Sequence, residues 1–195
     1  MFFEKLKNFN VLLASNSKRR HELLNQLGVE FKVINQDIDE SFSNELKSNM
    51  ITDYLAKKKS SLLVENLKKN DLLITSDTIV WHKNSALGKP KNRIEAFEMI
   101  KSLENSSHEV ITSICISTVN FQVIVNEKTL VFFDSIDEND LLYYTKTSDV
   151  LDRAGSYGIQ DYIGHIGIKK IQGSYSNVLG FPTNLFVNTI NSMNL

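Results

Sequence analysis

The sequence contains a single cysteine, Cys115, so the chain has no second thiol with which to form an internal disulfide bond. Its four histidines are scattered, and no Cys/His spacing typical of a structural zinc site occurs. Cys115 stands between two isoleucines, and we therefore expect it to be a buried strand residue.

Long apolar runs are missing as well. The apolar segment at residues 11–14 is too short to cross a bilayer. Residues 1–5 lack the basic start and the long apolar stretch of a signal peptide. We therefore expect a cytoplasmic protein with no membrane partner.

Neither sign of charge dominates. Lysine and arginine total 22 and aspartate and glutamate total 23, which gives a formal net charge of -1. Such a chain has no global field that attracts nucleic acid, so a nucleic-acid-binding module is disfavoured. A strongly salt-dependent affinity for DNA or RNA would revive that hypothesis. Any binding of a polyanion must come from a local cluster of cations.

Two common catalytic signatures are also absent. No G-x-x-x-x-G-K-[ST] segment occurs, which argues against a P-loop NTPase. No serine lies in a G-x-S-x-G context, so covalent catalysis from a nucleophile elbow has no support.

The chain has 195 residues, 42% of them hydrophobic, which is enough for a sizeable core. We expect one domain over residues 1–195, with two lobes. Glycine-rich residues 154–160 are expected to be irregular. Strands and helices alternate early and a β-rich part follows, which predicts an α/β (α+β) protein around a mixed sheet. The predicted strands are 11–14, 31–34, 72–81, 110–119, 121–133 and 166–171, and the predicted helices are 18–27, 48–69, 93–103, 137–144 and a last one after Pro182.

The most informative stretch is residues 12–24, where an apolar strand runs into a Ser/Asn loop and then into a helix. The loop carries Ser15, and two guanidinium groups follow at Arg19 and Arg20. A helix N-terminus attracts anions because its first amides are unpaired and its dipole is positive there. Arginine forks match phosphate oxygens, so we interpret this segment as a phosphate-binding site.

Other charged residues are ambiguous when taken singly. Lys59 and Lys89 are most simply solvated surface charges. Asp77 ends an apolar strand, where it is either a plain helix cap or part of a ligand site, because α/β proteins bind ligands at the carboxyl ends of strands. Asp39 and Glu40 form an acidic loop that, together with Asp77, could supply oxygen ligands for magnesium.

These segments occur in an order that resembles the Maf proteins, nucleoside triphosphate pyrophosphatases related in fold to the inosine triphosphatases. The resemblance covers nearly the whole sequence. The matching motifs are Leu-Ala-Ser-Asn-Ser-Lys-Arg-Arg with the following Glu-Leu-Leu and Leu-Gly (12–28), Asp-Ile-Asp-Glu (37–40), Leu55-Ala56 with Lys59, Ser-Asp-Thr-Ile-Val (76–80), Gly-Lys-Pro (88–90), His-Glu-Val-Ile-Thr (108–112), Ala-Gly-Ser-Tyr-Gly-Ile-Gln (154–160) and Gly-Ser-Tyr-Ser-Asn-Val-Leu-Gly-Phe-Pro (173–182).

Three positions depart from the family pattern. Lys18 replaces a usual proline, Ser113 a usual glycine and Ser60 a favoured alanine. Lys18 gives up a fixed φ angle at the helix start but adds a cation, so phosphate binding is expected to survive. Ser113 affects only the expected local shape of the backbone.

The resemblance implies a mixed, elongated sheet flanked by helices around a central cleft, and hydrolysis between the α- and β-phosphates of a nucleoside triphosphate. It implies that Asp77 is the catalytic carboxylate, as base for the attacking water, as metal ligand or as both, and that Glu40 is a metal ligand. The phosphates would be bound by Ser15, Arg19, Arg20, Lys59 and Lys89. Positioned charge of this kind is the main catalytic device in phosphoryl transfer.

The Tyr-Gly-Ile-Gln version of the glycine-rich motif resembles the branch of the family that acts on dTTP and UTP. Gln160 both donates and accepts hydrogen bonds, which suits a uracil or thymine edge. Arg19, Thr78 and Gln160 match the positions linked to specificity in this branch. A branch that prefers methylated guanine nucleotides lacks the glutamine.

The resemblance further implies a divalent cation, Mg²⁺, Mn²⁺ or Co²⁺, as cofactor and a homodimer as a common assembly. An alternative function is a nucleotide-binding regulator of septum formation and cell division with little turnover. The acidic and basic residues of a hydrolytic site are both present, and simple anion capture does not require both.

Overall fold

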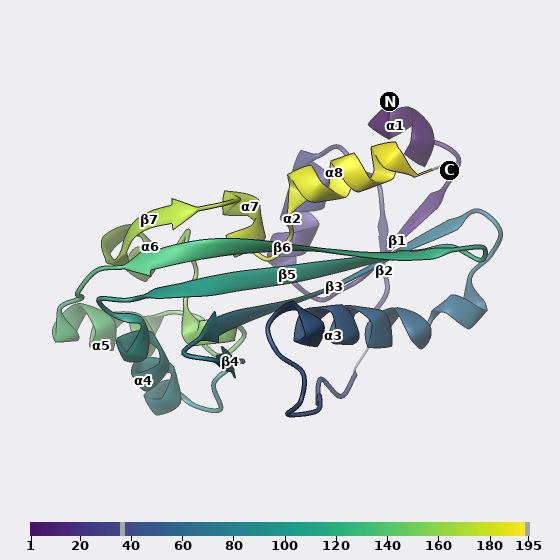
Figure 1. Ribbon diagram of the computed structural model, residues 1–195. Coiled ribbons are helices and arrows are strands. Elements are labelled where there is room, and N and C mark those ends of the chain that lie inside the picture. The colour runs from purple at the N-terminus through teal and green to yellow at the C-terminus, as the bar shows by residue number, and fades with distance from the viewer. Residues whose placement is uncertain (36–37, 194–195) are drawn as a thin grey trace. The chain divides into compact units, whose positions relative to one another are not determined.

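The computed structural model describes residues 1–35 and 38–193 (Figure 1). The described strands form one seven-stranded mixed sheet with the order β2-β1-β3-β5-β6-β7, to which β4 is added on β3. The strands are β1 (Asn10–Ala14), β2 (Lys32–Val33), β3 (Asp71–His82), β4 (Ser85–Leu87), β5 (Ser107–Ser117), β6 (Gln122–Phe133) and β7 (Ile168–Gln172). Helices flank the sheet, as the sequence predicts.

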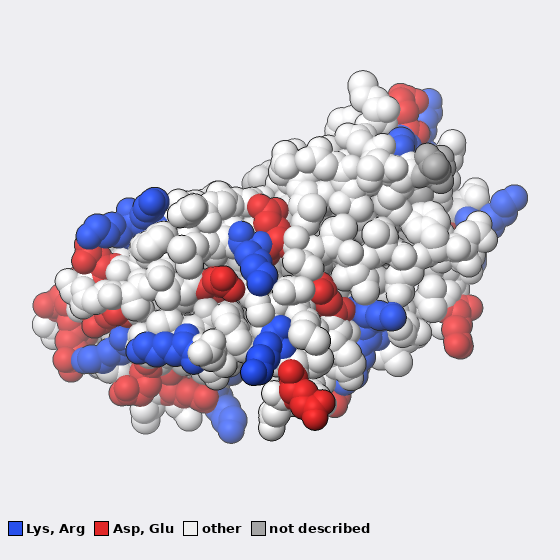
Figure 2. Space-filling model, in the orientation of Figure 1, with Lys and Arg blue, Asp and Glu red and all other residues white. Residues whose placement is uncertain are grey.

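The chain divides into two compact units. The first contains Met1–Asp77, Thr112–Glu127 and Gly180–Leu195, and the second contains Thr78–Ile111 and Lys128–Leu179. On the face drawn in Figure 2, acidic and basic side chains are intermingled, in keeping with the balanced composition.

In the first unit, β1 pairs in parallel with β2 and with the first half of β3. Helix α3 (Asn49–Ser61) covers one face of these strands, and the Thr75 hydroxyl donates to the carbonyl of Ala56 at 2.7 Å. Helices α1 (Phe2–Leu6), α2 (Lys18–Gln26) and α8 (Thr183–Ser192) lie on the other face (Figure 1). The rings of Phe2 and Phe186 meet edge to face and join α1 to α8.

The second unit has its own hydrophobic core. Helix α4 (Arg93–Leu103) begins at Asn92, whose side chain accepts a hydrogen bond from the Glu95 amide. Helix α5 (Glu138–Thr147) begins in the same way at Asp137. The core residues are Val80, Ala96, Ile100, Leu103, Val110, Val131, Phe133, Leu141, Tyr144, Val150, Tyr157 and Ile163.

Several sequence predictions are confirmed. Helix α2 ends before Gly28, which adopts a φ of 71°, a conformation that glycine favours. The expected helix at 93–103, the last helix after Pro182 and the fully buried strand position of Cys115 are confirmed as well.

Other predicted boundaries are wrong. The predicted helix at 48–69 ends at Ser61, and the apolar side chain of Leu62, just past that end, is 56% exposed. The chain then passes through a short 3-10 turn, Val64–Asn66. Ile94, in the first turn of α4, is 77% exposed although its side chain is apolar.

Short helices were the main omission. Helices α1, α6 (Tyr162–Gly167) and α7 (Tyr175–Val178) were not predicted. Because α6 includes Ile166, the predicted strand at 166–171 begins only at Ile168. No helix within the described residues is long and apolar enough to span a membrane.

Candidate active site

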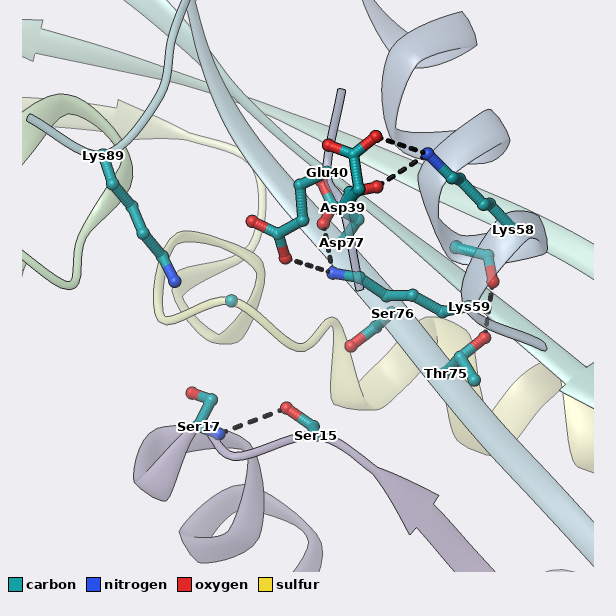
Figure 3. A network of polar contacts seen from close by, with 12 residues as sticks. Ser15, Ser17, Asp39, Glu40, Lys58, Lys59, Thr75, Ser76, Asp77 and Lys89 are labelled. Carbon is teal, nitrogen blue, oxygen red and sulfur yellow. Dashed lines mark hydrogen bonds and ion pairs between the residues drawn. The ribbon is translucent and has the colours of Figure 1, made fainter. Parts of the chain in front are cut away.

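The loop between β1 and α2 has the geometry of an anion-binding turn. The Ser15 hydroxyl accepts from the Ser17 amide at 3.2 Å (Figure 3). The carbonyl of Ser15 is held by Nε2 of His21 at 2.7 Å. Among the described residues, no side chain caps the N-terminus of α2. A helix N-terminus carries a positive dipole that attracts a negatively charged ligand.

Arg20 joins this loop to the sheet. Its Nε donates to the carbonyl of Gly180 at 3.0 Å, and its Nη1 donates to the carbonyl of Ser76 at 3.1 Å and to the Ser15 hydroxyl at 3.3 Å. The backbone thus fixes the position of the guanidinium group. Gly180 has a φ of 105°, a conformation that L side chains rarely adopt, and so glycine is required at this contact.

Lys59 brings two carboxylates together. It extends from α3, and its Nζ lies 2.6 Å from Oδ1 of Asp77 and 2.8 Å from Oε1 of Glu40 (Figure 3). Asp77 is only 6% exposed, whereas about half of the Glu40 side chain is exposed. The arrangement is a buried carboxylate and a half-exposed carboxylate that share one ammonium group.

The parallel register explains why these groups meet. Ala14 at the end of β1 is paired with Thr75 of β3, so Ser15 and Ser76 follow at the same edge. Side chains alternate along a strand. Thr75 contacts α3, and Asp77 points to the same side, toward Lys59.

Burial dominates the electrostatics of Asp77. It raises the pKa of this carboxyl above the ordinary value, because the charged form loses solvation. Lys59 and, more weakly, Arg20 act in the opposite direction, whereas Glu40 adds to the increase. A carboxylate with a raised pKa is a stronger base than an ordinary one, which suits proton abstraction from water.

The donor set fits a metal ion that is completed by its substrate. Within the described residues, no group of three or more His, Cys, Asp or Glu side chains forms a metal site. Glu40 and Asp77 nevertheless converge on one cation, Lys59 Nζ. Magnesium is often held by one or two carboxylates together with phosphate oxygens and water, and this pair of acids matches that mode.

The remaining predicted site residues belong to different surroundings. Arg19 is half-buried in the first turn of α2. Thr78, Lys89 and Gln160 are in the second unit. There, Nζ of Lys89 lies 2.8 Å from Oδ1 of Asp152, and the Gly155 amide donates to the carbonyl of Gly88. Their roles as substrate contacts stay predictions. Asp37 of the acidic motif lies outside the described residues.

Sequence reasoning missed three residues that shape the site: His21, Lys58 and Gly180. Gly180 was noted only as part of a motif, and its contact with Arg20 spans 160 positions of the chain. Lys58 donates to the carbonyl of Asp39 at 2.6 Å, beside Glu40. No local pattern reveals such pairs, because they depend on how distant segments pack.

The chain is similar to known proteins over almost its whole length. The pattern of the Maf-like protein family matches residues 10–193. A protein of Christiangramia forsetii called dTTP/UTP pyrophosphatase is 46% identical over 99% of this chain and 98% of its own length. A protein of the same name from Flavobacterium psychrophilum is 48% identical over 94% of each chain.

A solved structure supports the fold. The Ham1 protein of Staphylococcus aureus has a TM-score of 0.55 and 13% identity over 93% of this chain and 98% of its own. At that identity the likeness concerns the fold alone. Given the family match over almost the whole length and relatives above 40% identity, the chain belongs to the Maf-like protein family.

Proposed function

We propose that this protein is a nucleoside triphosphate pyrophosphatase that hydrolyses the α–β phosphoanhydride of dTTP and UTP and releases the monophosphate and pyrophosphate. The observation that carries the proposal is the ion-paired triad of Asp77, Lys59 and Glu40 beside the Arg20 loop. Relatives that bear the name dTTP/UTP pyrophosphatase and align over nearly the whole chain support the substrate class.

In this mechanism, the loop of the first unit binds the phosphates. Arg20, the Ser15 hydroxyl and the first amides of α2 supply donors to the phosphate oxygens. Arg19 and Lys59 add positive charge. Asp77 accepts a proton from the attacking water, which then attacks phosphorus as pyrophosphate leaves. Electrostatic donors of this kind typically contribute about 10²–10³ in rate each.

A divalent cation completes the site. Glu40 and Asp77 would hold it, and it would neutralise charge that develops on the phosphates. Mg²⁺, Mn²⁺ and Co²⁺ are the proposed ions. Oδ1 of Asp77 contacts Lys59. Measuring both metal binding and turnover in Asp77→Asn would separate the proposed roles of Asp77 as base and as metal ligand.

Substrate choice is assigned to Gln160, Thr78 and Arg19. The amide of Gln160 presents a donor and an acceptor, and a uracil or thymine edge has the complementary groups. Lys89 is proposed as a further phosphate contact. The cleft shared by two lobes, a homodimeric assembly and a cytoplasmic location stay predictions.

The test is a panel of purified nucleoside triphosphates, normal and modified, with Mg²⁺ or Mn²⁺ and product analysis. We expect pyrophosphate and monophosphate from dTTP and UTP, and a loss of about 10²–10⁴ in kcat in Asp77→Asn. Asp134→Asn, which alters an exposed carboxylate paired with Lys169, is the matched control. Nucleotide binding without turnover in the wild type would favour the regulator of cell division, and full activity in Asp77→Asn would remove this residue from catalysis.

A further inference from the structure

Two consecutive lysines of α3 hold the same loop in different ways. Lys59 binds the Glu40 carboxylate, as described above. Lys58 turns to the loop backbone, and its Nζ donates to the carbonyls of Asp39 at 2.6 Å and Ser41 at 3.3 Å. These two carbonyls flank Glu40 on both sides. Figure 3 shows Lys58 reaching Asp39 while Lys59 reaches Glu40 and Asp77.

The loop itself has a matching local structure. The Asp39 carboxylate accepts from the Ser41 amide at 2.9 Å and from its hydroxyl, which closes a turn around Glu40. These bonds, with help from Lys58, hold the pKa of Asp39 below its usual range. The Nζ of Lys58 lies 3.6 Å from this carboxylate. One ammonium group therefore ties together both ends of the turn.

We propose that Lys58 is a positioning residue for Glu40: by binding the carbonyls on either side, it holds the Glu40 carboxylate where a divalent cation needs it. The inference rests on the proposed function, in which Glu40 is a metal ligand. Lys58 itself contacts neither metal nor substrate. Its side chain is 27% exposed, and a hydrogen bond to an exposed carbonyl is individually modest, so the effect belongs to loop order and metal affinity rather than to folding.

The direction in which Lys58→Met changes the Mn²⁺ affinity distinguishes a positioning role of Lys58 from the effect of its charge alone. Removing a positive charge near a cation site weakens repulsion, so electrostatics alone predicts tighter binding of Mn²⁺ in Lys58→Met. Loss of positioning predicts weaker binding, because Glu40 must be ordered when the metal binds. The two explanations therefore make opposite predictions for one measurement.

The experiment compares wild type with Lys58→Met, Lys58→Arg and the control Lys57→Met, which removes an exposed lysine one position away on the same helix. Mn²⁺ binding is measured by electron paramagnetic resonance with an α,β-methylene analogue of dTTP. In Lys58→Met we expect the Mn²⁺ dissociation constant to rise about 3–10-fold, as the loss of one hydrogen bond would cause, with kcat at saturating Mn²⁺ within about twofold of wild type. Lys58→Arg, which keeps a donor of the same charge, should restore most of the affinity.

A second readout does not depend on turnover. Hydrogen exchange of the free protein should be faster in a peptide covering residues 38–47 in Lys58→Met than in Lys57→Met. An unchanged or tighter Mn²⁺ constant, or equal exchange in the two variants, would overturn the role of Lys58 while leaving dTTP hydrolysis intact. Failure of the proposed function appears separately, as a wild type that releases no pyrophosphate.

Discussion

The ammonium group of Lys59 lies between two acids, 2.6 Å from Asp77 and 2.8 Å from Glu40. Only one of these acids is buried. The ion pair with Lys59 favours the charged form of Asp77, which burial disfavours. A general base needs this charged form in order to accept a proton. An isolated carboxylate at that position would be neutral over a wider pH range.

Replacing Lys59 by Met should shift the pH dependence of the reaction. Burial raises the pKa of Asp77 and Lys59 lowers it, so the pKa of Asp77 should be still higher in Lys59→Met. We expect the acidic limb of the kcat/KM profile to move upward by about 1–3 pH units, besides a loss of rate. The measurement is kcat/KM for dTTP between pH 5 and 9. Lys57→Met should keep the wild-type profile, and an unmoved limb in Lys59→Met would dissociate that limb from Asp77.

Arg20→Lys tests the geometry of the guanidinium group. A lysine keeps the charge but cannot reach Gly180, Ser76 and Ser15 from one planar fork. We expect kcat/KM to fall about 10²-fold. Steady-state kinetics give the result, and Glu22→Gln, which removes an exposed charge of the same helix away from its N-terminus, is the control. Equal activity in Arg20→Lys would show that only the charge matters.

Ser113 has a structural role in this chain. Its hydroxyl lies 2.6 Å from Thr52 Oγ1 and 2.7 Å from Asp53 Oδ1, and the residue is fully buried. Ser113→Ala removes the one hydroxyl proton that these two oxygens share, and it should lower the free energy of unfolding by about 1–3 kcal/mol. Urea unfolding measures the change. Ser102→Ala, at an exposed position of α4, should change stability by less than about 0.5 kcal/mol.

His108 predicts a pH dependence of stability. Burial, reinforced by His82, lowers its pKa from 6.5 to about 3. Between these values the unfolded chain binds a proton that the folded protein does not, so this histidine destabilises the fold progressively as pH falls below 6.5. At pH 5 the loss should be about 2 kcal/mol relative to pH 7.

The comparison of wild type with His108→Gln isolates this contribution. Between pH 4.5 and 7.5, the free energy of unfolding measured with urea should change less with pH in the variant than in wild type. The variant also loses the 2.6 Å contact between Nε2 of His108 and the Tyr157 hydroxyl, which lowers its stability at every pH. The exposed His165→Gln should keep the wild-type slope. Parallel slopes for wild type and His108→Gln would mean that His108 titrates in the same way folded and unfolded.

Local signals explain most of what was predictable. A few neighbouring residues determine several helix ends: the loop before Lys18, the caps at Asn92 and Asp137, and Gly28 in the αL conformation. The end of α3 was misplaced because Leu62 and Leu63 continue an apolar pattern past the point where the helix has a surface to cover. Helix α6 contains two glycines and a histidine, a composition that gives little helical signal.

The site was predictable as a set of residue types and only in part as an arrangement. The resemblance named Lys59, Asp77 and Glu40 from motif order. Their direct contact depends on the parallel register of β1 with β3 and on α3 packing across those strands. Lys58 carries no motif signal, since neighbouring lysines on a helix look alike until one of them has a partner.

The solitary thiol of Cys115 has a practical consequence. Cys115 is fully buried in β5, so thiol reagents should reach it only when the sheet opens. The rate at which Cys115 is modified should therefore report the rate of unfolding. A cysteine introduced at any exposed position would then react first and alone. Paired spectroscopic labels, one on each compact unit, could follow the distance between them while nucleotide is added.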